Sequence, residues 1–223
     1  MGVDSSLPSY TQIQFLTNAA NNYLLSMTPE AAGYLLARGI TKDVARSARL
    51  GFIAEPEIGH EHMEGMLSIP YMTRSGCVNI KARCIQDHDC KAAGHPKYSG
   101  PHGSGTFLYN VMDFGDQESI CITEGELDTL ALKVAGLNSI AVPGVAAWKA
   151  NKHWPVCFSC YQRVYIFADN DRKEGGRNPG FDLAKRIADS IDNAVIISLP
   201  PNEDVSTCLV KYGAGYLRDK AGL

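Results

Sequence analysis

The chain is predicted to be an α/β protein, with a mostly parallel sheet flanked by helices and a smaller α+β subdomain before it. Two observations predict this. From residue 119 onward, short apolar runs rich in β-branched residues alternate with helical segments, as in parallel sheets whose strands are joined by helices. Before residue 115, helix-capping signals are followed by alternating strand patterns. We therefore predict a helical lead-in at 1–27, a subdomain at 28–115 and an α/β domain at 116–223.

The N-terminal elements follow from capping and alternation. Residues 11–26 are predicted to form a first helix. Thr28 can cap a second, since Pro29 suits the first helical position, and Thr41 can cap a short third. Residues 67–70 and 78–84 then alternate as strands.

Lys81 and Arg83 are predicted to lie on one face of the second of these strands, because side chains repeat every two residues. The segment from Arg74 to Lys97 contains five basic residues and two acidic ones. This excess of positive charge is a modest basic patch, compatible with phosphate contacts. Residues 87–105 are predicted to be a long loop.

The second half is regular. Helical stretches are also expected up to residue 162, and a last helix near Asp204 or Val205. The predicted strands are 119–123, 139–142, 163–168 and 194–199, with helices at 126–136 and 180–191.

Carboxylates follow two of these strands. Glu124 and Asp128 come after the strand 119–123, and Asp169 and Asp171 after 163–168. Side chains at the carboxyl ends of such strands converge where open α/β sheets bind ligands. Two carboxylates 4 Å apart repel by roughly 4 kcal/mol at an effective dielectric near 20. A divalent cation that prefers oxygen ligands, Mg²⁺ above all, would neutralise them.

Composition indicates a globular protein. The 223 residues are 45% hydrophobic, and no apolar run approaches the roughly 18 residues that a membrane helix needs. Seven cysteines without a signal-peptide pattern suggest reduced thiols in a cytoplasm. The formal net charge of −3 argues by itself against a nucleic-acid partner, but two bound Mg²⁺ ions would make it positive.

Zinc is judged unlikely from the cysteine spacing. Cys157 and Cys160 have metal-ligand spacing, but a structural zinc needs four ligands, so buried reduced thiols explain them more simply. Cys84, His88, Cys90 and His95 lie near one another in sequence without a clean spacing. Trp148 and Trp154 are expected in the core rather than stacked on bases.

The second half resembles a Toprim domain. The resemblance depends on Glu124-Gly125-Glu126-Leu127-Asp128 after one strand and Asp169-Asn170-Asp171 after another. Further stretches are similar to the catalytic core of DnaG-type primases over about residues 28–215. These are Tyr34–Ile40, Leu50-Gly51-Phe52, Leu67–Pro70, Lys81-Ala82-Arg83, Lys97-Tyr98-Ser99, Phe107–Asn110 and Leu199–Val205.

This resemblance implies a minimal or phage-like DNA primase, a nucleotidyltransferase of the bacterial cytoplasm. It would synthesise short RNA primers from NTPs on single-stranded DNA, with two Mg²⁺ or Mn²⁺ ions. The implied metal ligands are Glu124, Asp128, Asp169, Asp171 and Asp204, with Glu124 alternatively a general acid or base. The implied contacts to nucleic acid or NTP are Lys81, Arg83, Lys97, Arg172 and Lys173.

The chain also departs from the family pattern. The loop after Arg172 is longer and basic, and Ser206 stands where the family often has a second acid. The family's zinc-binding and helicase-binding modules are not recognised here, so a separate zinc module and a replicative helicase are expected partners, and no membrane.

Two other functions stay open. A Toprim nuclease would use the same carboxylates to cleave phosphodiesters, although the N-terminal resemblance favours a primase. A non-catalytic DNA-binding replication adaptor is opposed by the intact Glu124, Asp128, Asp169 and Asp171.

Overall fold

The computed structural model describes residues 7–170 and 178–223, and these divide into two compact units. The first contains residues up to 36 together with 41–107, and the second contains 37–40 and 108–223. Within the described residues, no helix has the length and apolar character needed to cross a membrane.

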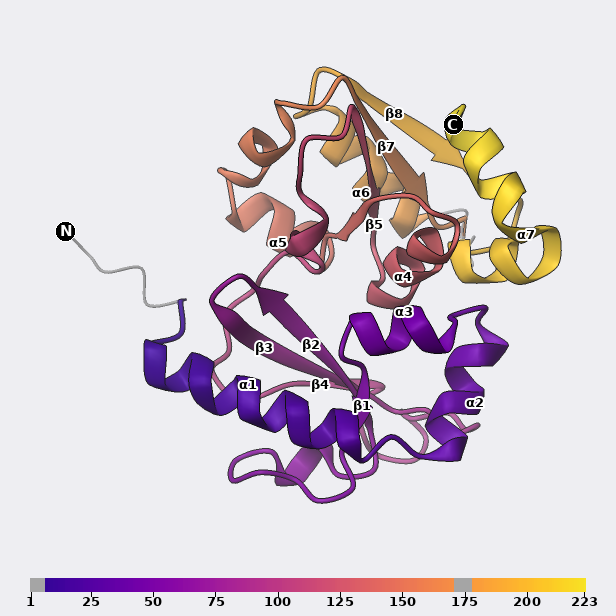
Figure 1. Cartoon of the computed structure of the whole chain (residues 1–223). Helices are drawn as coiled ribbons and strands as arrows, with labels where there is room; N and C mark the ends of the chain where they lie inside the picture. Colours follow the sequence, from indigo (N-terminus) through magenta and orange to yellow (C-terminus); the bar gives the residue numbers. More distant parts are fainter. Residues whose placement is uncertain (1–6, 171–177) are drawn as a thin grey trace. The chain divides into compact units, whose positions relative to one another are not determined.

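The first unit is an antiparallel sheet with helices (Figure 1). Its strand order is β1-β2-β3-β4, and α1 packs on β3. Ser9 and Gln12 form a capping box at the start of α1, and Thr28 and Thr41 accept hydrogen bonds from the first turns of the next two helices, as predicted. The elements are α1 (Tyr10–Leu25), α2 (Pro29–Ala37), α3 (Lys42–Ser47), β1 (Gly51–Phe52), η1 (Glu61–Met63), β2 (Leu67–Thr73), β3 (Gly76–Arg83) and β4 (Tyr98–Ser99).

The second unit is a parallel sheet in the order β6-β5-β7-β8, with helices packed against its strands, which confirms the predicted fold class. The predicted strands recur within one residue of their expected ends and the helix at 126–136 within two. The helix at 180–191 ends three residues earlier than expected, and the helical stretches expected up to residue 162 end at Phe158. The elements are η2 (Val111–Asp113), β5 (Ser119–Thr123), α4 (Glu126–Val134), β6 (Ser139–Ala141), α5 (Val145–Ala150), η3 (Trp154–Phe158), β7 (Arg163–Ala168), α6 (Pro179–Ala188), β8 (Ala194–Ser198) and α7 (Val205–Ala221).

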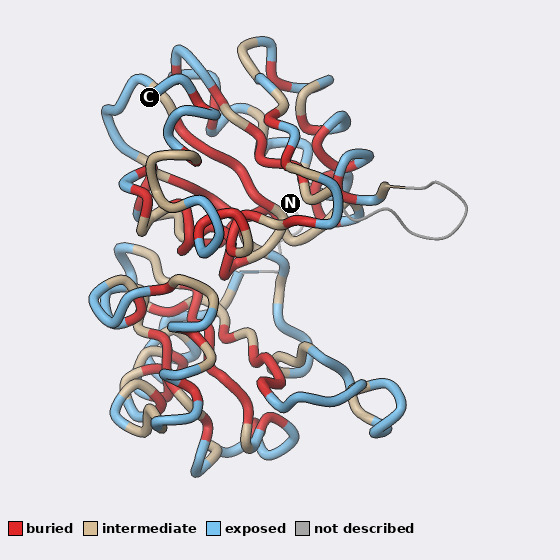
Figure 2. Tube along the Cα trace, turned by 90° about the vertical axis from the view of Figure 1, so that its right-hand side faces the viewer, coloured by how far each residue is buried: buried red, intermediate tan, exposed pale blue. Residues whose placement is uncertain are grey.

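Two apolar clusters cover the opposite faces of this parallel sheet. Alternate residues of β5 supply them: Ile120 and Ile122 belong to one cluster and Cys121 to the other. Figure 2 shows the buried segments as red stretches of the chain. Trp148 is buried in the first cluster and donates from Nε1 to Ser190 Oγ at 3.1 Å, so its predicted place in the core is confirmed. Trp154 packs against the same cluster.

Candidate active site

Acidic side chains leave the parallel sheet from the carboxyl ends of two adjacent strands. β5 and β7 pair in parallel, with Ile122 opposite Ile166. Glu124 and Asp169 each follow directly after the last residue of their strand. This register brings the two half-buried residues to the same edge of the sheet.

Asp128 lies in the first turn of α4 and is only 9% exposed. Its Oδ1 accepts hydrogen bonds from the backbone N–H of Ser206 at 3.1 Å and from Ser206 Oγ at 3.0 Å. Burial, and then the charge of Asp204, raise the pKa of Asp128 to about 6, against the opposing effects of Ser206 and Arg38. The folded chain therefore holds a buried carboxyl group with a perturbed pKa here, as is common at functional sites.

Asp204 caps the last helix as well as acting on Asp128. Its Oδ1 accepts from the backbone N–H of Thr207 at 2.7 Å, at the start of α7. The charge of Asp204 is one of the causes of the raised pKa of Asp128. The loop after β8, which carries Asp204, is therefore close enough to the first turn of α4 for the two acids to interact electrostatically.

Asn170 connects this loop to the turn after β7. Its side-chain amide donates to Leu199 O at 2.8 Å, and its backbone O accepts from the N–H of Asn202 at 3.0 Å. Asn178 Nδ2 donates to Asn170 Oδ1 at 3.0 Å. These bonds fix the turn that carries Asp169 relative to the loop that carries Asp204.

Two glycines allow the backbone to approach these carboxylates. A Cβ on Gly125 would lie 2.4 Å from Asp128 Oδ2, and a Cβ on Gly180 would lie 2.6 Å from Asp169 O and 3.0 Å from Asp169 Cβ. Real Cβ atoms do not come so close, so a side chain at either position would displace the acid. We call Glu124, Asp128, Asp169 and Asp204 the carboxylate site.

The oxygen donors of this site fit a hard divalent cation such as Mg²⁺. Burial is the main cause of the raised pKa of Asp128, and the negative charge of Asp204 adds to it, so a bound cation would favour the ionised form of Asp128. Asp171, Arg172 and Lys173 lie outside the described residues.

Two residues at this site were not singled out from the sequence. Ser206 was noted only as a missing acid, yet it supplies two hydrogen bonds to Asp128. Arg38 lies far away in sequence, in the short segment 37–40 of the second unit, and its charge opposes the rise in the pKa of Asp128. The sequence signal that could have identified Arg38 is the stretch Tyr34–Ile40, which resembles the DnaG-type primase core.

The basic residues of the first unit gather around one tyrosine. Lys81 Nζ lies 4.4 Å from the centroid of the Tyr98 ring, and the Arg83 guanidinium lies 5.0 Å from it. This confirms that the two residues share a face of β3. Arg83 also hydrogen-bonds to the Tyr98 hydroxyl and is 7% exposed, whereas Lys81 is half-buried and Lys97 is exposed.

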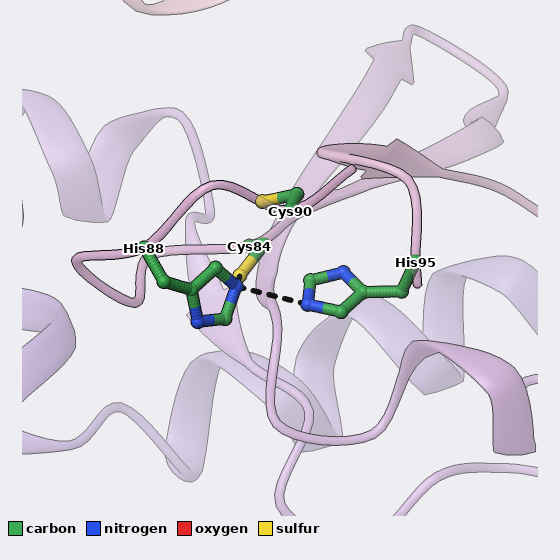
Figure 3. Close-up of side chains that lie close together, drawn as sticks. All are labelled: Cys84, His88, Cys90 and His95. Carbon is green, nitrogen blue, oxygen red and sulfur yellow. Dashed lines mark hydrogen bonds between the residues drawn. The ribbon is translucent and has the colours of Figure 1, made fainter. Parts of the chain in front are cut away.

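Four possible metal ligands meet on the loop between β3 and β4. Figure 3 shows His88 and His95 with a ring nitrogen of each directed toward the other, beside the thiols of Cys84 and Cys90. One ligand atom from each of these residues lies within 4.8 Å of the others. The sequence spacing had suggested only a loose grouping. We call these four residues the Cys/His cluster.

The other cysteine pair is different. Cys157 and Cys160 are both exposed, so the prediction that they are buried thiols is wrong. They lie around the short helix η3 and the turn after it, where the chain stays on the surface. In the part of the chain that the structure describes, no other group of three or more Cys, His, Asp or Glu side chains converges as closely as the Cys/His cluster.

Solved structures share this fold. The zinc-binding and RNA polymerase domains of Aquifex aeolicus primase match 99% of the chain with a TM-score of 0.76 and 20% identity, and the chain spans 63% of the length of those solved domains. A DnaG primase catalytic domain bound to single-stranded DNA matches 96% of the chain and 81% of its own length, with a TM-score of 0.69 and 18% identity. The primase fragment of the bacteriophage T7 primase-helicase matches 88% of the chain and 74% of its own, with a TM-score of 0.59 and 19% identity.

A sequence relative shows the family. No protein-family model matches the chain. The Gene 57 protein of Mycobacterium phage D29 is 33% identical over 162 residues, which make up 70% of this chain and 97% of that protein. The chain therefore belongs to the family of the Gene 57 protein of Mycobacterium phage D29, and its fold is that of a DnaG primase catalytic core.

Proposed function

We propose that this protein is a DNA primase that synthesises short RNA primers on single-stranded DNA during phage replication. One observation carries the proposal. Asp128, in the first turn of α4, is buried within the electrostatic influence of Asp204 on the loop after β8, and its pKa is raised to about 6. Glu124 and Asp169 follow the adjacent parallel strands β5 and β7. In a fold shared with DnaG catalytic domains, such carboxylates suit metal-assisted nucleotidyl transfer.

Divalent cations, Mg²⁺ or Mn²⁺, would be held by the carboxylate site, together with Asp171 from outside the described residues. When bound, two such ions would supply the positive charge that stabilises the attacking and leaving oxygens of phosphoryl transfer. Ser206 and Gly125 would then hold Asp128 in one orientation, and Asn170 would keep Asp169 in register with Asp204. Glu124 would be a further ligand, or would take the proton from the attacking 3′-hydroxyl.

The basic residues would bind phosphates. Lys81 is half-buried and stacks on Tyr98, which suits a contact to template or triphosphate. Arg83 is enclosed by the rings of Tyr34 and Tyr98, so its proposed contribution is to hold Tyr98 in place as well as to add positive potential. Lys97, Arg172 and Lys173 are proposed as further phosphate contacts. The likeness to a DNA-bound DnaG domain and to a primase-helicase fragment supports single-stranded DNA and a helicase as partners.

A primer-synthesis assay tests the proposal, using single-stranded DNA, labelled NTPs and Mg²⁺ or Mn²⁺. We expect short RNA products that disappear in Asp169→Ala. The matched control is Asp182→Ala, which removes an exposed acid of α6 and leaves the strand-end turns untouched. Cleavage of the template without primer synthesis would show that the protein is a nuclease and not a primase. Binding of DNA without either reaction would support an adaptor instead.

A further inference from the structure

We propose that Cys84, His88, Cys90 and His95 bind one Zn²⁺ ion, which closes the loop between β3 and β4. Two thiols and two imidazoles are the donor set of many structural zinc sites. The four ligand atoms lie within 4.8 Å of one another. All four residues come from a stretch of 12 residues, so one loop supplies the whole coordination sphere.

Two distances within the Cys/His cluster lie near those of a tetrahedral metal site. With Zn–N near 2.05 Å and Zn–S near 2.3 Å, tetrahedral ligand atoms are separated by roughly 3.3 Å for N–N, 3.6 Å for N–S and 3.8 Å for S–S. Cys84 Sγ lies 3.6 Å from His88 Nε2, and His88 Nε2 lies 2.9 Å from His95 Nε2. Small adjustments of the two rings would therefore admit a metal ion.

A hydrogen bond outside the cluster selects the ligand atom of His95. Its Nδ1 lies 3.1 Å from the backbone oxygen of Pro96. A carbonyl oxygen can only accept, so Nδ1 carries the proton and Nε2 keeps a lone pair directed at the cluster. Histidines that bind metals usually donate their other ring N–H in this way.

The loop is held in shape by hydrogen bonds among its own residues. Cys84 N–H donates to Lys97 O at 2.9 Å, which joins the two ends of the loop. Asp89 Oδ1 accepts from the N–H of Lys91 at 2.9 Å, and His95 N–H donates to Cys90 O at 3.0 Å. These turns bring the third and fourth ligands back toward the first two.

The charge and the softness of the ligands in the Cys/His cluster favour Zn²⁺ there over Mg²⁺, the cation proposed for the carboxylate site. Two thiolates neutralise Zn²⁺, so the half-enclosed site would carry no net charge. Thiolate and imidazole are soft or borderline ligands, which suit Zn²⁺ and not Mg²⁺. The loop begins directly after Arg83 and ends directly before Tyr98, so the ion would also fix the spacing of these two contacting residues.

Metal analysis of the full chain tests the site. Protein purified from zinc-supplemented cells should contain about one Zn²⁺ per chain. The double variant His88→Gln/His95→Gln should lose at least nine-tenths of it. The matched control Cys157→Ser/Cys160→Ser removes the exposed cysteine pair outside the cluster and should keep the full amount.

Cobalt substitution gives a second measurement on the same proteins. Co²⁺ added to the metal-free chain should produce the visible bands of a tetrahedral ion and a thiolate charge-transfer band, both abolished by Cys84→Ser. His88 is exposed and His95 half-exposed, so circular dichroism should show the histidine variant to be folded. An unsubstituted chain without zinc and without tetrahedral Co²⁺ bands overturns the proposal, as does a folded histidine variant with undiminished zinc.

Discussion

The carboxylate site and the Cys/His cluster show two ways in which a chain assembles metal ligands. The first collects oxygen donors from the ends of β5, β7 and β8, whose positions are fixed by an apolar core on both faces of the sheet. The second collects sulfur and nitrogen donors from a single loop, whose ends are joined by the Cys84–Lys97 backbone hydrogen bond. The sheet should therefore keep its shape without a metal, whereas the loop should depend on one.

The largest expected effect separates the chemistry of the two sites. Asp169→Ala should reduce primer synthesis on the order of a thousandfold, because losing a ligand to a catalytic cation removes several kcal/mol of charge stabilisation. Its zinc content should stay the same as that of the unsubstituted chain. Product yield and metal content are measured on one preparation. Equal loss of zinc and synthesis would mean that the two sites are not independent.

Removal of zinc should have the next largest effect, on stability. A ligand present at 1,000 times its dissociation constant stabilises a fold by about 4 kcal/mol. A loss of that size lowers the melting temperature of a chain of this length by roughly 10 °C. His88→Gln/His95→Gln and a zinc chelator should both produce this shift, measured by thermal unfolding, and the chelator should not shift the variant further. The same chelator should leave Cys157→Ser/Cys160→Ser as sensitive as the unsubstituted chain.

Gly125→Ala tests whether the carboxylate site needs its tight packing. The new Cβ would meet Asp128 Oδ2 at 2.4 Å, so Asp128 must move. We expect a loss of about 1–3 kcal/mol in unfolding free energy and a fall in synthesis of about a hundredfold. Gly33→Ala is the control, because no atom outside its chain neighbours and its own helix backbone lies within 4 Å of its new Cβ, and alanine favours the helix α2. Full activity in Gly125→Ala would show that the position of Asp128 is unimportant.

The sequence predicted most of the second unit because its signals are local and periodic. Apolar runs identified β5 and β7, and the acids that follow them marked one edge of the sheet. The contribution of Ser206 could not be predicted in this way, since it reaches across from α7 to Asp128. Arg38 acts on the same acid from a segment that is distant in sequence.

The Cys/His cluster was noted in the sequence, but it was not predicted to bind a metal, and the reason is different. Its ligands are separated by three, one and four residues, so no regular pattern is visible. The pairing of β3 with β4 brings the ends of the loop together. The strand β4 has only two residues, and the sequence pattern did not predict it. The regular spacing of Cys157 and Cys160 was interpreted as a pair of buried thiols, and this was wrong because both side chains are exposed.

The last expected effect, on stability alone, concerns Ser206, the residue that replaces an expected acid. Ser206→Ala removes the 3.0 Å hydrogen bond from Oγ to Asp128 but keeps the backbone donor at 3.1 Å. A hydrogen bond to a buried carboxylate is worth about 1.5–3 kcal/mol, so unfolding free energy without divalent cations should fall by about that much. The pKa of Asp128 should rise further, since Ser206 opposes the effects of burial and Asp204. Denaturant titrations in a chelator measure the loss, with Ser75→Ala in the exposed β2–β3 turn as the control. If Mg²⁺ restores the stability of Ser206→Ala, the cation takes over the charge that the serine hydroxyl balances. A variant that stays equally destabilised in Mg²⁺ would place the cation away from Asp128.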